Sequence, residues 1–279
     1  MDPEMIAALT RLFGASEHIA RVGETPIHAL VAVFARVGAV VALLPGFGER
    51  TLPARVKLAA AVMFTMAIWP AVVPLAEEAV AAGRPGLADG APIPLFRALM
   101  AEAAVGLMLG IAVRLTVMAL QLAGAIAAQA TSVSQIAGAQ VTPDPMPALG
   151  ALLVVAGIAL AMHLGLHVKA AALLARSYSV APLGEFPLAA DVGRWGAARA
   201  GAAFDLAVSL AAPFVVASFA YNLALGAINR AMPQLMVAFV GAPAITAGAL
   251  FLLWICAPDL LAHWHTRLDA ALADPFGTD

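Results

Sequence analysis

Residues 222–234 read Asn-Leu-Ala-Leu-Gly-Ala-Ile-Asn-Arg-Ala-Met-Pro-Gln, and they stand between two long apolar stretches. Arg230 would cost about 2.5 to 3.5 kcal/mol at the centre of a membrane helix, and Pro233 cannot donate the backbone hydrogen bond that a continuing helix needs. The chain must therefore turn, pair or meet water within this stretch.

The composition on either side of this stretch is that of an integral membrane protein. Hydrophobic residues make up 63% of the 279 residues, charged residues only 11%, and the mean hydropathy is +0.94. Such an apolar share far exceeds that of soluble domains. The net charge of -2 gives no basic surface for nucleic acid. Asp2 and Glu4 stand where a cleaved signal peptide carries basic residues, so we expect no such peptide.

Hydrophobic periodicity predicts an all-α fold. Apolar residues at helical spacing between Met5 and Phe13 predict an amphipathic helix within residues 1–22. Because a membrane-spanning helix needs about 20 apolar residues, the rest of the chain has room for about six long apolar helices. We place these at residues 26–44, 58–75, 95–130, 148–174, 201–228 and 235–261. We expect residues 1–279 to form a single domain, with small-residue faces such as that of Gly106 and Gly110 allowing close helix packing.

Charges inside and between these helices fit a simple serpentine topology poorly. The loop that carries Arg50, Arg55 and Lys57 and the segment 131–147, which has no lysine or arginine, would lie on the same side of the membrane. We therefore expect some helices to be broken or not to span conventionally. A charge inside an apolar helix needs a protein partner, a pore or water, and this applies to Arg36, Glu102, Arg114 and Asp205.

The segment from residue 130 to residue 147 is predicted to be a loop. It is rich in small and polar residues and ends in three alternating prolines, which prevent a regular helix. Its non-helical backbone can be satisfied only where water or protein surrounds it. An ordinary solvated loop and a segment that closes a pore are both compatible with this composition.

Motifs for enzymatic chemistry do not appear in the sequence. We find no nucleophile with a base and an acid, no Walker loop and no dinucleotide fingerprint, so we expect neither an enzyme nor a cofactor. His163 and His167 are four residues apart and would share one face of the expected helix 148–174. No nearby carboxylate or thiolate completes a metal site there, and we expect no metal. His263, Trp264 and His265 end the last expected helix and are interpreted as interfacial residues.

Two blocks of sequence resemble the FliR family of flagellar type III export-gate proteins, which has a counterpart in virulence injectisomes. The first block is Glu49-Arg50 with Pro53 and Arg55 to Leu58. The second is Asn222 to Gly226, followed by Arg230, Pro233-Gln234, Phe239, Gly241 and Pro243. The similarity extends over nearly the whole chain.

The resemblance implies a non-enzymatic subunit of the export gate in the bacterial inner membrane, within the flagellar basal body. One FliR-like chain would join FliP-like and FliQ-like membrane proteins in a ring that passes unfolded flagellar proteins, and an FlhB-like subunit would surround its cytoplasmic entrance. The loop 130–147 resembles the plug of the family, with Thr131, Ser132, Ser134, Gln135, Gly138, Gln140, Asp144 and Pro145. The expected subunit-interface residues are Arg50, Pro53, Lys57, Asn222, Gly226, Arg230, Pro233, Gln234, Gly241 and Pro243.

Three alternatives remain open on sequence grounds. An injectisome subunit would carry the same motifs as a flagellar one. Stand-alone secondary transporters also contain broken helices and embedded charges, although they commonly show an inverted internal repeat, which we do not detect here. A scaffold without a conduit would have the same sequence pattern.

For Arg230 a second role is open besides the subunit interface. Its charge could complement the carbonyl end of its own helix, which would contribute about 0.3 to 1 kcal/mol.

Overall fold

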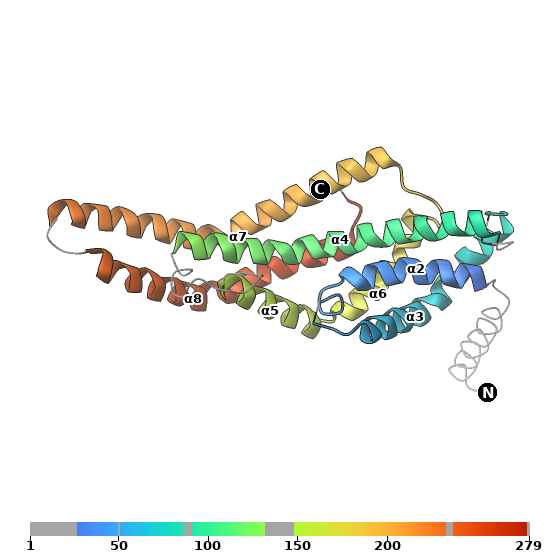
Figure 1. The fold of residues 1–279 in the computed structure, drawn as a ribbon, viewed down its shortest axis with the longest axis horizontal. Coiled ribbons are helices and arrows are strands. Elements are labelled where there is room, and N and C mark those ends of the chain that lie inside the picture. Colours follow the sequence, from blue (N-terminus) through green and yellow to red (C-terminus); the bar gives the residue numbers. More distant parts are fainter. Residues whose placement is uncertain are drawn as a thin grey trace, which may run out of the picture. The chain divides into compact units, whose positions relative to one another are not determined.

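The computed structural model describes residues 27–49, 51–85, 87, 91–131, 148–232 and 237–277, with the side chains of residues 237–243 left aside. Within these ranges the fold is all-α and contains no strand (Figure 1). The helices are α2 (Ile27–Leu43), α3 (Ala54–Ala81), α4 (Pro92–Ala130), α5 (Ala148–His163), α6 (Leu166–Val180), α7 (Ala189–Ala231) and α8 (Val237–Ala273). The amphipathic helix expected within residues 1–22 lies outside the described residues.

Most expected helices are present, but several are longer than predicted. Helix α3 continues through Pro70 and Pro74 to Ala81 because good helix formers follow its last proline. Helix α8 continues past residue 261 to Ala273, so Trp264 does not lie at a helix end. Trp264 is fully buried, which corrects its interpretation as an interfacial residue.

The expected helix 148–174 is broken into α5 and α6. Gly165 has a φ of 80°, a left-handed conformation that glycine adopts without steric cost, and its N–H bonds Met162 O at 3.2 Å. Helix α5 therefore ends at His163, and His167 belongs to the next helix. The prediction that these two histidines share one helix face is wrong, because the break lies between them.

Within the described residues, four helices are long and apolar enough to cross a membrane, namely α3, α4, α7 and residues Ala244–Ala273 of α8. The broken pair α5 and α6 would make a fifth span. Helix α2 has only 17 residues, slightly fewer than the roughly 20 that a bilayer requires. The chain is thus an integral membrane helical protein in which not every apolar helix is a conventional span.

Contacts divide the chain into two compact units, each described by itself. Unit 1 consists of Met1–Ile111 and His167–Gly193, and unit 2 consists of Ala112–Leu166 and Arg194–Asp279. Helix α4 contributes its first half to unit 1 and its second half to unit 2. The interpretation of residues 1–279 as a single domain stays a prediction.

Unit 1 is built around α2, which packs beside α3 (Figure 1). Seven residues of α2 between Ala29 and Val41 are buried at helical spacing. Gly106 and Gly110 of α4 face α2 so closely that a Cβ atom on Gly106 would overlap Arg36 O, and one on Gly110 would lie 2.8 Å from Leu43 Cβ. The predicted close packing at these two glycines is therefore confirmed.

Unit 2 is built around Trp264 of α8. Its indole Nε1 donates a hydrogen bond to Thr116 O of α4 at 2.8 Å, and its ring packs on Gly157 of α5. Helices α4 and α5 meet at Gly124 and Gly150, where a Cβ atom on Gly124 would overlap the backbone of Gly150. The two helix ends on either side of residues 132–147 are thereby held close together.

We expect Gly124→Ala to destabilise the protein by about 1 to 3 kcal/mol. The added methyl group would overlap the backbone of Gly150, so α4 and α5 would have to move apart. The measurement is SDS-induced unfolding of the purified protein followed by circular dichroism. Gly248→Ala in α8 is the matched control, since no atom lies within 4 Å of the added Cβ there. Equal unfolding midpoints for the two variants would contradict the proposed close contact.

Candidate functional site: a buried ion pair and an exposed helix face

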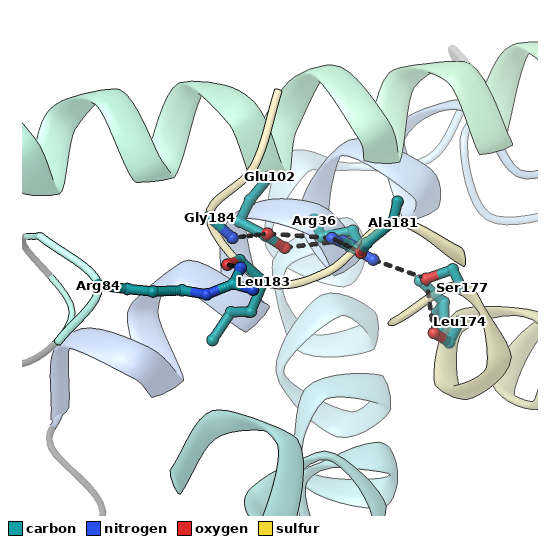
Figure 2. A network of polar contacts seen from close by, with 8 residues as sticks. All are labelled: Arg36, Arg84, Glu102, Leu174, Ser177, Ala181, Leu183 and Gly184. Carbon is teal, nitrogen blue, oxygen red and sulfur yellow. Dashed lines mark hydrogen bonds and ion pairs between the residues drawn. The ribbon is translucent and has the colours of Figure 1, made fainter. Parts of the chain in front are cut away.

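A bidentate ion pair lies in the core of unit 1. Arg36 of α2 donates from Nε to Glu102 Oε2 at 2.7 Å and from Nη2 to Glu102 Oε1 at 3.0 Å (Figure 2). Both side chains are 0% exposed. A buried charge is tolerated only when it is paired and its remaining hydrogen bonds are satisfied, so the surroundings of this pair decide whether it is stable.

The surroundings satisfy the remaining polar atoms of the pair. Arg36 also donates from Nη1 to Ser177 Oγ at 3.0 Å and from Nη2 to Ala181 O at 2.8 Å, while its guanidinium lies 3.9 Å from the ring centroid of Tyr178. The Glu102 carboxylate accepts a third hydrogen bond, at Oε1, from the N–H of Gly184 at 2.7 Å. The network therefore joins α2, α4, α6 and the connection after α6 at one point.

A second, more exposed contact holds the same connection. Arg84, which follows α3, donates to Leu183 O (Figure 2). It also pairs with Glu185 Oε1 at 2.8 Å. Gly184 lies between these two contacts with a φ of 80°, so the turn depends on glycine. Of the embedded charges predicted to need partners, Arg36 and Glu102 thus pair with each other, while Asp205 is exposed on α7.

The predicted subunit-interface residues lie at two places. Pro53 is exposed immediately before α3, and Lys57 in its first turn donates from Nζ to Gly48 O at 3.1 Å. Asn222, Gly226 and Arg230 are exposed near the end of α7. The others lie where the structure gives no side-chain description: Arg50, Pro233, Gln234, Gly241 and Pro243.

The last part of α7, residues 219–231, is called the α7 arm here. None of its residues is buried, and large apolar side chains are exposed on it, with Phe219 at 71% and Leu223 at 67%. The amide of Asn222 donates to Ser218 O of its own helix at 2.9 Å. An apolar surface of this kind that also carries Asn222 and Arg230 is typical of an interaction site rather than of a face in contact with lipid alone.

The predicted plug-like loop follows the end of α4 in unit 2. Thr131 is buried, and its hydroxyl donates to Ala127 O at 2.7 Å. Ser218 of α7 donates from its hydroxyl to Ala130 O, the last residue of α4. The remaining predicted loop residues lie outside the described part: Ser132, Ser134, Gln135, Gly138, Gln140, Asp144 and Pro145. Helix α4 ends and α5 begins at the limits that the sequence predicted for this segment.

Reasoning from sequence missed the partners that surround the ion pair. Ser177, Tyr178 and Gly184 carried no signal of their own, because serine, tyrosine and glycine are common in and after such helices. The sequence indicated only that Arg36 and Glu102, each within an apolar helix, needed a partner; it did not indicate which residues these partners are.

Known bacterial proteins are similar to this chain over most of its length. A sequence profile described as bacterial export proteins, family 1, matches residues 27–271. The flagellar biosynthetic protein FliR of Caulobacter vibrioides is 31% identical over 250 residues, which cover 86% of this chain and 93% of that protein. FliR of Pectobacterium carotovorum is 27% identical over 86% of this chain and 90% of that protein. FliR of Escherichia coli K12 is 28% identical over 217 residues, which cover 75% of this chain and 76% of that protein.

The profile match extends over both units, from the beginning of α2 at residue 27 to residue 271 in α8. The chain therefore belongs to the FliR family of bacterial export proteins.

We expect Glu102→Ala to destabilise the protein by about 3 to 5 kcal/mol, because it leaves the Arg36 guanidinium buried without its counterion. The measurement is the same SDS-induced unfolding. Glu185→Ala is the matched control, since its partner Arg84 remains solvated and an exposed pair contributes about 0 to 1 kcal/mol.

The double variant Arg36→Met with Glu102→Leu should be more stable than Glu102→Ala alone, because it removes both charges instead of one. If Glu102→Ala were no more harmful than Glu185→Ala, the buried pair would not be the contact on which unit 1 depends.

Proposed function

We propose that this chain is a subunit of the flagellar type III protein export gate in the bacterial inner membrane. In this proposal it assembles with FliP-like and FliQ-like membrane proteins into the conduit that passes rod and other unfolded flagellar proteins. An FlhB-like subunit contacts the complex from the cytoplasmic side. The role is structural, and no step of it requires the chain to act as an enzyme.

The observation that supports assembly most directly is the α7 arm. The thirteen residues 219–231 at the end of α7 have no buried side chain, so packing within the chain contributes little to the stability of this part of the helix, and most of its surface is apolar. In the apolar 18-residue stretch that makes α7 a candidate span, only 33% is buried within this chain, and in that of α8 only 28%. Neighbouring subunits would cover part of this surface, and lipid would cover the rest.

Arg230 is the residue of the α7 arm with the greatest need of a partner. It is exposed in the last turn of α7, among apolar side chains such as Ile228 and Met232. We propose that it binds carbonyl groups or a carboxylate on a neighbouring subunit, and that Asn222 and Gly226 pack at the same interface. Pro53 and Lys57 form the second proposed contact region, at the beginning of α3.

The segment 130–147 is the proposed plug. Support comes from its two ends: Gly124 and Gly150 bring α4 and α5 into contact, and Ser218 holds the last carbonyl of α4. A long segment with both ends fixed in this way can enter a pore without disturbing the helices that carry it.

The test of the proposed function is native mass spectrometry of the tagged chain, co-expressed with the FliP-like and FliQ-like proteins of the same bacterium. We expect one copy of this chain in a large mixed complex. Co-expression with injectisome counterparts is the parallel sample, and preferential assembly there would favour the injectisome alternative. Purification alone, as a monomer or small homo-oligomer, would favour a stand-alone transporter.

In the same experiment, Arg230→Ala should reduce the yield of the mixed complex about tenfold or more, because truncating one partner of a buried charge contact costs several kcal/mol. Arg267→Ala is the matched control, since Arg267 is also exposed but lies on α8 outside the α7 arm. Membrane insertion of both variants is checked by membrane fractionation. An intact complex with Arg230→Ala would contradict the interface role.

Deleting residues 134–140 should increase ion conductance through the assembled complex in planar bilayers, because a shortened plug no longer fills the pore. The complex with the full-length chain, reconstituted at the same protein-to-lipid ratio, is the control. A deleted variant that assembles normally but conducts no more than the control would contradict the plug assignment and favour an ordinary solvated loop.

A further inference from the structure

Unit 1 contains a cleft of about 590 Å³ at the beginning of α4. Its floor includes the buried Leu87, and its rim carries the apolar side chains of Ile93 and Phe186, which are 84% and 49% exposed. The charged groups in its described lining are Arg84, Arg97 and Glu185. The described lining of the cleft is therefore both apolar and, by one charge, positive.

The two arginines of the cleft differ in their surroundings. Arg84 is fixed by its ion pair with Glu185 and its hydrogen bond to Leu183 O, which neutralises its charge locally. Arg97 is exposed on the second turn of α4, and no described residue pairs with it or accepts a hydrogen bond from it. Its guanidinium is the group of the cleft that is available to an anion.

The position of the cleft along α4 indicates which anion this is. Helix α4 begins at Pro92 and is one of the candidate membrane spans, and its 39 residues exceed the roughly 20 that a bilayer requires, so its first turns can reach the headgroup level at one end of the span. Phosphate groups of lipids lie at this level of a membrane, and long cationic side chains near helix ends reach them. The exposed Ile93 and Phe96 on the same helix end provide apolar contact for acyl chains.

We propose that this cleft binds a phospholipid with an anionic headgroup, its phosphate on Arg97 and its acyl chains along Ile93 and Phe96. A zwitterionic headgroup fits less well, because its cation would lie beside two arginines while the carboxylate of Glu185 is already engaged by Arg84. The site does not depend on the export-gate proposal, since it uses residues of unit 1 alone.

The test is native mass spectrometry of the full-length chain, with any partners that co-purify, titrated with dioleoyl phosphatidylglycerol or dioleoyl phosphatidylcholine. Wild-type protein should bind phosphatidylglycerol several-fold more tightly. Arg97→Gln should weaken phosphatidylglycerol binding about fivefold and leave phosphatidylcholine binding unchanged. Arg267→Gln, which removes an exposed arginine outside the cleft, should change neither.

Glu185→Gln provides a variant with the opposite expected effect. It removes the only described carboxylate of the cleft lining and releases Arg84, so phosphatidylglycerol should bind more tightly. A misfolded protein would not gain affinity, so this result would separate binding from stability. Equal binding of the two lipids by the wild type would overturn the proposal. So would an Arg97→Gln variant that keeps phosphatidylglycerol but loses a protein partner, since the cleft would then be a protein interface.

Discussion

The burial of one guanidinium is the constraint on which unit 1 depends. Arg36 is 0% exposed, and a buried charge without partners would cost several kcal/mol. Its partners come from α4, α6 and the connection after α6, so these elements must meet at one point. Gly106 lies one turn after Glu102 and lets α4 approach the backbone of Arg36 itself. The ion pair and the glycine contact are thus two parts of one helix crossing.

The α7 arm shows the opposite situation. In unit 1 the buried pair of Arg36 and Glu102 finds its partners within the chain, whereas residues 219–231 leave large apolar side chains exposed around Asn222 and Arg230. Exposed apolar surface of this extent is favourable only where lipid or other proteins cover it. This contrast between a paired buried charge and an uncovered arm is what the proposed role in a larger membrane complex requires, and it is compatible with the membership in the FliR family.

Sequence periodicity predicted the all-α class, the limits of α2 to within one residue and the end of α4, because long apolar runs leave few alternatives to a helix. It missed the break at Gly165, since a glycine inside an apolar run is compatible with both a continuous and a broken helix. Trp264 was misplaced because α8 continues beyond its apolar part. The need of Arg36 and Glu102 for partners followed from their charge, but their pairing across 66 residues is a tertiary contact that local patterns do not encode.

The Arg36 network also sets an order for biosynthesis. The counterion of Arg36 is 66 residues further along the chain, and the acceptors at Ser177 and Ala181 are 141 and 145 residues away. While the ribosome has made only α2 and α3, the first apolar helix therefore carries an arginine whose native partners do not yet exist. Stable membrane integration of this short helix must wait for α4, and the final hydrogen bonds for the connection after α6.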